Sequence, residues 1–195
     1  MNDLAIAQEV AAFQALIGTA PIEAPARTVA DNSIDKVRYR ELLLDRQKQM
    51  AEAIEDGKLH DELPALTLKH YFTPLDPKYG CHTYARQILL TARSLTIGRI
   101  HRHQHLNFIM QGDVIVSTEF EEKRLTAPQV FVSDAGIKRI VYALVDSIWV
   151  TVHLVRLGDE KDIEEIEDEL MAPTYEDIGL ISTVAELARV ELRGR

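Results

Sequence analysis

The stretch GRIHRHQHLNFIMQG, residues 98–112, places His101, His103 and His105 at alternate positions and closes on a glycine. Side chains two residues apart on a β-strand point to the same face of the sheet. The spacing therefore predicts a strand on which the three histidines converge. If the chain instead leaves the strand after His103, then His105 lies in a turn.

Short apolar runs flank this stretch on both sides between residues 83 and 157, and they are rich in β-branched and aromatic residues. They recur at a spacing of roughly 8 to 12 residues with turn signals between them, which is typical of a β-sandwich or barrel. We therefore predict a mainly β core, either a sandwich or a barrel. The expected strands lie at 83–92, 95–103, 106–112, 113–120, 122–133, 137–145 and 147–157.

The region before the barrel has helical patterns. A helix is predicted over residues 3–17, followed by an extended arm rich in Pro and Ala. Ser33 is the expected N-cap of the longest helix, which places Val37 and Leu44 near one face and ends at Gly57. The prolines beyond it predict loops, with room for one short strand.

The region after the barrel also predicts helices. Ile166 and Leu170 belong to one apolar helical stripe with acidic residues around it, and Thr183 with Glu186 forms a capping box for a last helix. The chain is thus expected to consist of an N-terminal helical arm, a barrel and C-terminal helices. These three regions are 1–82, 83–157 and 158–195.

Composition limits the classes of partner. The chain has 195 residues, is 46% hydrophobic and carries a net charge of −9, with a pI near 5.3. This size predicts one domain with helical additions, and the acidic balance opposes binding to nucleic acid or to anionic membranes.

Cys81 is the single cysteine, so no intramolecular disulfide can form. The N-terminus has acidic residues where a secretory signal has basic ones, and no apolar run is long enough to span a bilayer, so we expect a cytoplasmic protein.

The central stretch resembles the first motif of the cupin superfamily, in which an H-x-H pair is followed by Glu or Gln and then by Gly. His101 and His103 match the pair, with Asn107 at the acidic position by one count. Counted backward from the closing glycine, His105 takes the acidic position and the pair becomes Arg99 and His101. The resemblance implies a mainly β fold with a single β-barrel of the jelly-roll type, and a bound divalent transition metal ion of unspecified identity.

The second cupin motif, P-x-G-x-x-H, resembles SDAGIKR at 133–139, where Gly136 fits and Lys138 or Arg139 replaces the histidine. His153 lies in SIWVTVHLV and shares a strand face with Trp149. If the apolar face of that strand points to the core, His153 points outward. If the interior is a partly polar cavity, His153 points inward and could replace the missing ligand.

Neutral imidazoles are ligands that Zn, Fe, Ni, Cu and Mn accept, so the candidate metal ligands are His101, His103, His105 and His153. Glu119 is the one carboxylate on a following strand that could join them. Adjacent strand residues point in opposite directions, so one of Lys138 and Arg139 could enter the cavity and bind a carboxylate or phosphate, although a solvated edge pair is the favoured interpretation.

Three hypotheses for function follow. One is a metal-dependent cupin that acts on a small polar molecule, and another is a sensor that binds such a molecule without turnover. The alternative is a non-catalytic scaffold, either a phage assembly or virion-associated protein or a factor that binds a host protein, because the long helical and extended N-terminal region and the acidic helix exceed what a minimal enzyme needs. The stretches GRIHRHQHLNFIMQGDVIVSTEF and AGIKRIVYALVDSIWVTVH, together with the acidic helix, also resemble small cupin-like proteins of tailed bacteriophages, which suggests an origin rather than a chemistry. Barrel edges and the N-terminal arm also predict a symmetric homo-oligomer.

Overall fold

The computed structural model describes residues 32–58, 68–119 and 121–193, so the predicted helix at 3–17 and most of the predicted arm lie outside the described residues. The strands are β1 (Leu68–Phe72), β2 (His82–Leu90), β3 (Leu95–Ile97), β4 (Ile100–His101), β5 (His105–Gln111), β6 (Asp113–Ser117), β7 (Glu122–Thr126), β8 (Gln129–Ser133), β9 (Ile140–Ala143), β10 (Ser147–Val155) and β11 (Met171–Ala172). The helices are α2 (Ile34–Glu55), α3 (Ile163–Leu170) and α4 (Val184–Arg193), with short 3-10 turns η2 (Glu160–Asp162) and η3 (Glu176–Ile178).

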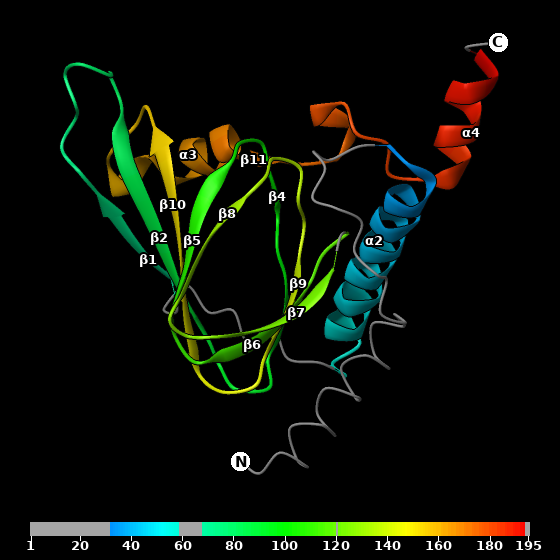
Figure 1. Ribbon diagram of the computed structural model, residues 1–195, viewed down its shortest axis with the longest axis horizontal. Helices are drawn as coiled ribbons and strands as arrows, with labels where there is room; N and C mark the ends of the chain where they lie inside the picture. Colours follow the sequence, from blue (N-terminus) through cyan, green and yellow to red (C-terminus); the bar gives the residue numbers. More distant parts are fainter. Residues whose placement is uncertain (1–31, 59–67, 120, 194–195) are drawn as a thin grey trace.

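The strands form two main antiparallel sheets, with orders β1-β2-β10-β5-β8 and β3-β9-β6-β7. From β2 to β10 the chain alternates between these sheets, except at the β6–β7 hairpin and at β4, which pairs with β11. This order is that of a jelly roll, and the predicted mainly β class is confirmed. Among the described residues, no ladder joins one main sheet to the other, so the β core is an open sandwich rather than a closed barrel (Figure 1).

The apolar core lies between the two sheets, because alternate residues of each strand point inward. Trp149 of β10 and Ile109 of β5 meet Val114 and Val116 of β6 there. Trp149 also donates a hydrogen bond from its indole Nε1 to Asn107 Oδ1 at 2.9 Å. The interior therefore includes a polar pair beside its apolar packing.

Helix α2 covers the outer face of the second sheet, as Figure 1 shows. Tyr39 and Leu43 pack on Ile115, and the Tyr39 hydroxyl lies 2.7 Å from Ser117 Oγ. The helix prediction is confirmed, but Leu44 is exposed and the buried face includes the charged Lys36 and Arg40. Val37 is buried as predicted. Hydrophobic periodicity places charged residues on the solvent side, which is why it missed the burial of Lys36 and Arg40.

Arg40 fixes this helix to the sheet. Its Nε donates to Glu119 Oε2 at 2.9 Å, and its Nη1 donates to Asn32 Oδ1 and to the Ile181 carbonyl oxygen, each at 3.0 Å. Its guanidinium also lies 5.3 Å from the centre of the Tyr175 ring. Glu119 thus pairs with a helix residue.

The C-terminal helices behave as predicted. Ile166 and Leu170 of α3 pack on Tyr84, and Thr183 caps α4 by accepting a hydrogen bond from the Glu186 backbone N–H at 3.2 Å. In the part of the chain that the structure describes, no helix combines the length and apolar character needed to cross a bilayer.

Two predicted strands are broken. The strand expected at 95–103 divides into β3 and β4, because the Gly98 N–H turns to the Arg139 carbonyl oxygen at 2.8 Å and β4 then pairs with β11. The strand expected at 122–133 divides into β7 and β8 around Ala127 and Pro128. Proline cannot donate a ladder hydrogen bond, so the chain leaves the sheet there.

Candidate metal centre

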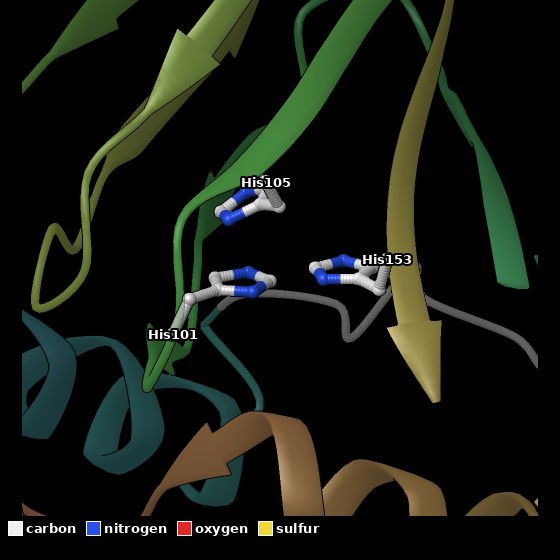
Figure 2. Close-up of side chains that lie close together, drawn as sticks. All are labelled: His101, His105 and His153. Atoms are coloured by element: carbon white, nitrogen blue, oxygen red, sulfur yellow. The ribbon is translucent and has the colours of Figure 1, made fainter. Parts of the chain in front are cut away.

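Three buried histidines from three strands meet inside the sandwich. His101 ends β4, His105 begins β5 and His153 lies in β10. Their ring centres are 4.0 Å apart for His101 and His105, 4.7 Å for His105 and His153, and 5.2 Å for His101 and His153. Figure 2 shows the three rings facing one another in the space between the strands.

The backbone of His101 is held on two sides. Its carbonyl oxygen accepts a hydrogen bond from the Gly136 N–H at 2.8 Å, and its strand pairs with β11 at Met171. Gly136 has a φ of 81°, a conformation that glycine adopts without strain, so the turn can approach His101 closely. These contacts fix the backbone position of His101, from which its ring extends into the interior.

His105 has a defined orientation. Its Nδ1 lies 3.2 Å from the carbonyl oxygen of His103, and a carbonyl can only accept, so Nδ1 carries the proton. The lone pair is then on Nε2, which is buried and has no hydrogen-bond partner in the described structure. His105 therefore presents a free ligand atom to the interior.

His103 does not join the cluster. The chain turns at residues 102–104, and the His103 side chain is exposed. The expectation of one strand carrying three convergent histidines is therefore wrong, because β4 and β5 are separate strands with different partners. His101 and His105 converge across this turn rather than along a strand.

His153 points inward. It shares the buried face of β10 with Trp149, whereas Leu154 on the opposite face is exposed. Of the two orientations considered for this strand, the structure has the one in which the interior is partly polar. The His153 Nε2 atom is buried and has no hydrogen-bond partner among the described residues, and the same holds for His101 Nδ1.

Burial keeps the three rings neutral. It lowers the pKa of His105 to about 4 and the pKa of His153 to about 3. Burial also holds the pKa of His101 well below its usual range, and the nearby His105 and His153 lower it further. Neutral imidazole is the form that binds metal ions, so near pH 7 the cluster is in the ligand state.

The cluster fits a metal ion. One ligand nitrogen from each ring lies within 4.8 Å of the others. If all three separations were 4.8 Å, an ion at the centre of the triangle would be about 2.8 Å from each nitrogen, and a movement of less than about 1 Å would bring each to a bonding distance of ~2.1 Å. Three neutral nitrogens with orphaned lone pairs form a donor set that suits Zn, Fe, Ni or Cu.

Glu119, the carboxylate considered from the sequence, lies outside the cluster because it is paired with Arg40. Among the described residues, the grouped metal-ligand candidates are all histidines. His82 and His70 have other partners, the Thr73 carbonyl oxygen at 2.8 Å and the Tyr84 hydroxyl at 2.7 Å.

Lys138 and Arg139 are both buried, so the interpretation as a solvated edge pair is wrong. Strand alternation does not apply to them, because β9 begins only at Ile140. Burial lowers the pKa of Lys138 to about 8, and the positive charge of Arg99 contributes.

A hollow of about 540 Å³ that opens onto the outer face of the five-stranded sheet reaches the edge of the cluster, since its lining includes His105 and His153 as well as exposed residues of that face. The rest of the wall is mainly apolar. It consists of Thr83, His103, Gln104, Leu106, Val132, Val152, Leu154 and Leu170.

Comparisons with known proteins concern the fold. No family model matches the chain, and no curated protein matches it. Among solved structures, it is similar to an ectoine synthase from P. lautus at 16% identity, over 60% of this chain and 88% of that one, with a TM-score of 0.41. It is also similar to an RmlC-like cupin from Shewanella frigidimarina NCIMB 400, with 16% identity, coverage of 50% and 81% and a TM-score of 0.37. A third, KdgF from a Halomonas species, has 19% identity, coverage of 52% and 91% and a TM-score of 0.36.

The strand order of the two main sheets is that of a jelly roll. Of the two counts of the cupin-like motif considered from the sequence, the geometry favours the count backward from the closing glycine, because His101 and His105 are in the cluster. Arg99, at the first histidine position of that count, is turned away and pairs with Glu167 at 2.6 Å. Asn107 is engaged by Trp149. The likeness to phage proteins stays a prediction.

Proposed function

We propose that this protein is a metal-dependent cupin in which His101, His105 and His153 hold a divalent transition metal ion and a small polar molecule binds beside it. The single observation that supports this most strongly is the set of three buried ring nitrogens without hydrogen-bond partners in the described structure. Leaving such groups unsatisfied costs free energy, and a metal ion would recover it.

The histidine cluster would leave part of the ion's coordination open. Three protein ligands with a free position are the arrangement of catalytic rather than structural zinc sites. A bound ion there would act as a Lewis acid toward a coordinated water or ligand. The contribution of this chain is to hold three neutral rings in a buried site, with the His105 ring oriented by the His103 carbonyl oxygen.

The scaffold alternative is less well supported, because a surface for protein contacts does not require three desolvated histidines in the interior. Burial disfavours the protonated form of each ring, so each histidine is neutral near pH 7 and can serve as a metal ligand. The sensor hypothesis shares the same site and differs only in turnover.

Metal content tests the proposal. The full chain, purified without a histidine tag, is expected to hold near one equivalent of a transition metal by elemental mass spectrometry, or to take it up on titration. His153→Ala should lose this metal, whereas His103→Ala, which changes an exposed histidine of the adjacent turn, should retain it. Absence of uptake in the folded parent, or equal loss in both variants, would contradict the metal centre.

We also propose that the chain forms a homodimer through the outer face of the five-stranded sheet. Alternate residues of these strands point away from the core, and many are large, apolar and exposed. The exposed members are Tyr71, Leu89, Leu106, Met110, Val130, Val132 and Leu154. The other main sheet, in contrast, has α2 packed on its outer face.

The area of this face matches what a dimer needs. The exposed fractions of its seven large side chains correspond to roughly 700 Å², compared with ~300–600 Å² for the largest patch of a typical monomer and ~800 Å² per partner in a stable interface. The face can also pack on a second copy of itself, because its large exposed side chains are apolar, and Lys69 of the same face lies on the edge strand β1, where its charge can stay in solvent.

Light scattering after gel filtration measures the oligomeric state directly. The parent is expected to be a dimer, and Met110→Glu combined with Leu154→Glu is expected to be a folded monomer. Val190→Glu, which adds a charge at an exposed apolar residue of α4, should leave the dimer intact. A monomeric parent would overturn this assignment and indicate another occupant of the face.

A further inference from the structure

Arg139 is a buried cation inside the sandwich. It is the last residue before β9, is only 9% exposed, and donates a hydrogen bond from Nη2 to the hydroxyl of Ser133. Its guanidinium also lies 5.9 Å from the centre of the Phe131 ring. Ser133 and Phe131 are alternate residues of β8, so the guanidinium lies along one face of that strand.

This position adjoins the histidine cluster. On the β5–β8 ladder, Ser133 stands opposite His105, and Phe131 stands opposite Asn107. Side chains directly opposite each other in an antiparallel pair have Cβ atoms about 5 Å apart. The guanidinium is therefore a close neighbour of His105 and Asn107, and its positive charge contributes to the lowered pKa values of His101 and His105.

No carboxylate among the described residues lies within ion-pair distance of Arg139; its polar contact there is the Ser133 hydroxyl. The contrast with Arg40 is direct, because the buried guanidinium of Arg40 has Glu119 Oε2 at 2.9 Å. A buried charge without a counter-ion is costly, so proteins keep one mainly where a ligand supplies the opposite charge.

Asn107 adds a second unsatisfied donor. Its Oδ1 accepts a hydrogen bond from Trp149 Nε1, and since the indole N–H can only donate, the amide orientation is defined. The Nδ2 atom is then the free end of the amide, and it is buried with no hydrogen-bond partner in the described structure. Asn107 itself is 0% exposed.

We propose that Arg139 and Asn107 form a carboxylate subsite next to the metal centre, so that the ligand of this protein carries a carboxylate group. This inference rests on the proposed function, because that function places a metal ion beside the subsite. The donors of the subsite are not metal ligands. The guanidinium fork and the amide N–H offer donors for the two oxygens of one carboxylate. A carboxylate also carries one negative charge to match the single guanidinium, whereas a phosphate carries more than one at pH 7 and would bury an uncompensated charge.

Acetate is the probe that tests this subsite, and Trp149 is the reporter, because it is the only tryptophan of the chain and is bonded to Asn107. Metal-free full-length protein is titrated with sodium acetate at constant ionic strength against sodium chloride, and inorganic phosphate is titrated separately. Acetate is expected to change the Trp149 emission saturably. Chloride should not, and phosphate should bind at least ~10-fold more weakly, a difference of about 1.4 kcal/mol.

Two variants and one control separate recognition from folding. Arg139→Gln should weaken acetate binding at least ~10-fold, and Arg38→Gln, at an exposed arginine of α2, should leave it unchanged. Asn107→Asp places a carboxylate beside the guanidinium, so it should abolish acetate binding and raise the thermal midpoint. This second variant keeps the test decisive if Arg139→Gln does not fold.

The outcomes distinguish the subsite from the metal centre. A protein that holds metal but shows no saturable response to acetate would overturn the subsite and leave the proposed function standing. Acetate binding that depends on Arg139, in a protein that takes up no metal, would support the subsite and overturn the metal centre. Tighter binding of phosphate than of acetate, or a lower thermal midpoint for Asn107→Asp, would also overturn the carboxylate assignment.

Discussion

Acidification of the metal-free protein should destabilise it through the histidine cluster. The folded-state pKa values of about 4 for His105 and about 3 for His153 lie below the value of ~6.5 expected in the unfolded chain. Between these values the unfolded state binds more protons than the folded state, so stability is present above pH ~6.5 and is lost as the pH falls.

The magnitude follows from these shifts. From pH 7 to pH 5, each of the two histidines is expected to cost about 2 kcal/mol of unfolding free energy, and the two together about 4 kcal/mol. This is a large part of the ~5–15 kcal/mol that typical domains possess. The loss should therefore be visible as a clear shift of the unfolding midpoint.

Urea unfolding in EDTA at pH 7 and pH 5, followed by the emission of Trp149, measures this loss. Replacing His105 and His153 together by Asn removes their titration, so the double variant should lose about 4 kcal/mol less between the two pH values than the parent does. His103→Asn, at an exposed position, serves as the control. If the parent and the double variant lose the same free energy, the reasoning from burial is refuted.

Two further predictions concern the framework of the site. Arg40→Met removes the guanidinium that neutralises buried Glu119, so urea unfolding should show a loss of about 3–5 kcal/mol, and a loss below 1 kcal/mol would contradict the proposed role of this pair. Gly112→Ala should destabilise the fold more than Gly80→Ala in thermal unfolding: both glycines have positive φ, but an added Cβ at Gly112 would lie 2.6 Å from Ser147 Cα, whereas one at Gly80 meets nothing within 4 Å. Equal midpoints for these two variants would show that the close approach is tolerated.

The sequence predicted the parts of this fold that depend on local pattern. Alternating apolar residues and turn signals between 83 and 157 predicted a mainly β core, and Thr183 predicted the cap of α4, because both signals act within a few residues. The covered face of α2 was not predictable in this way. It is held by Arg40, whose partner Glu119 is distant in sequence.

The candidate site was predictable in composition but not in geometry. The residues His101, His105 and His153 were visible as candidates, yet their meeting depends on the turn between β4 and β5 and on the pairing of β5 with β10. The burial of both Lys138 and Arg139 could not be predicted, because strand alternation applies only if both residues lie in β9. The structure begins β9 at Ile140, and a run of β-branched residues does not define the first residue of a strand to within two positions.

The pairing of β4 with β11 has a consequence for how the chain can be divided. Strand β11 is only two residues long, yet it lies against His101, and the Leu170 carbonyl oxygen just before it accepts the Arg102 N–H at 2.8 Å. A fragment ending at residue 157 would keep every strand of the two main sheets and still expose the backbone that carries one ring of the histidine cluster. The smallest unit able to assemble this cluster as the structure shows it therefore extends at least through Ala172, and a shorter fragment would be a sandwich without an intact site.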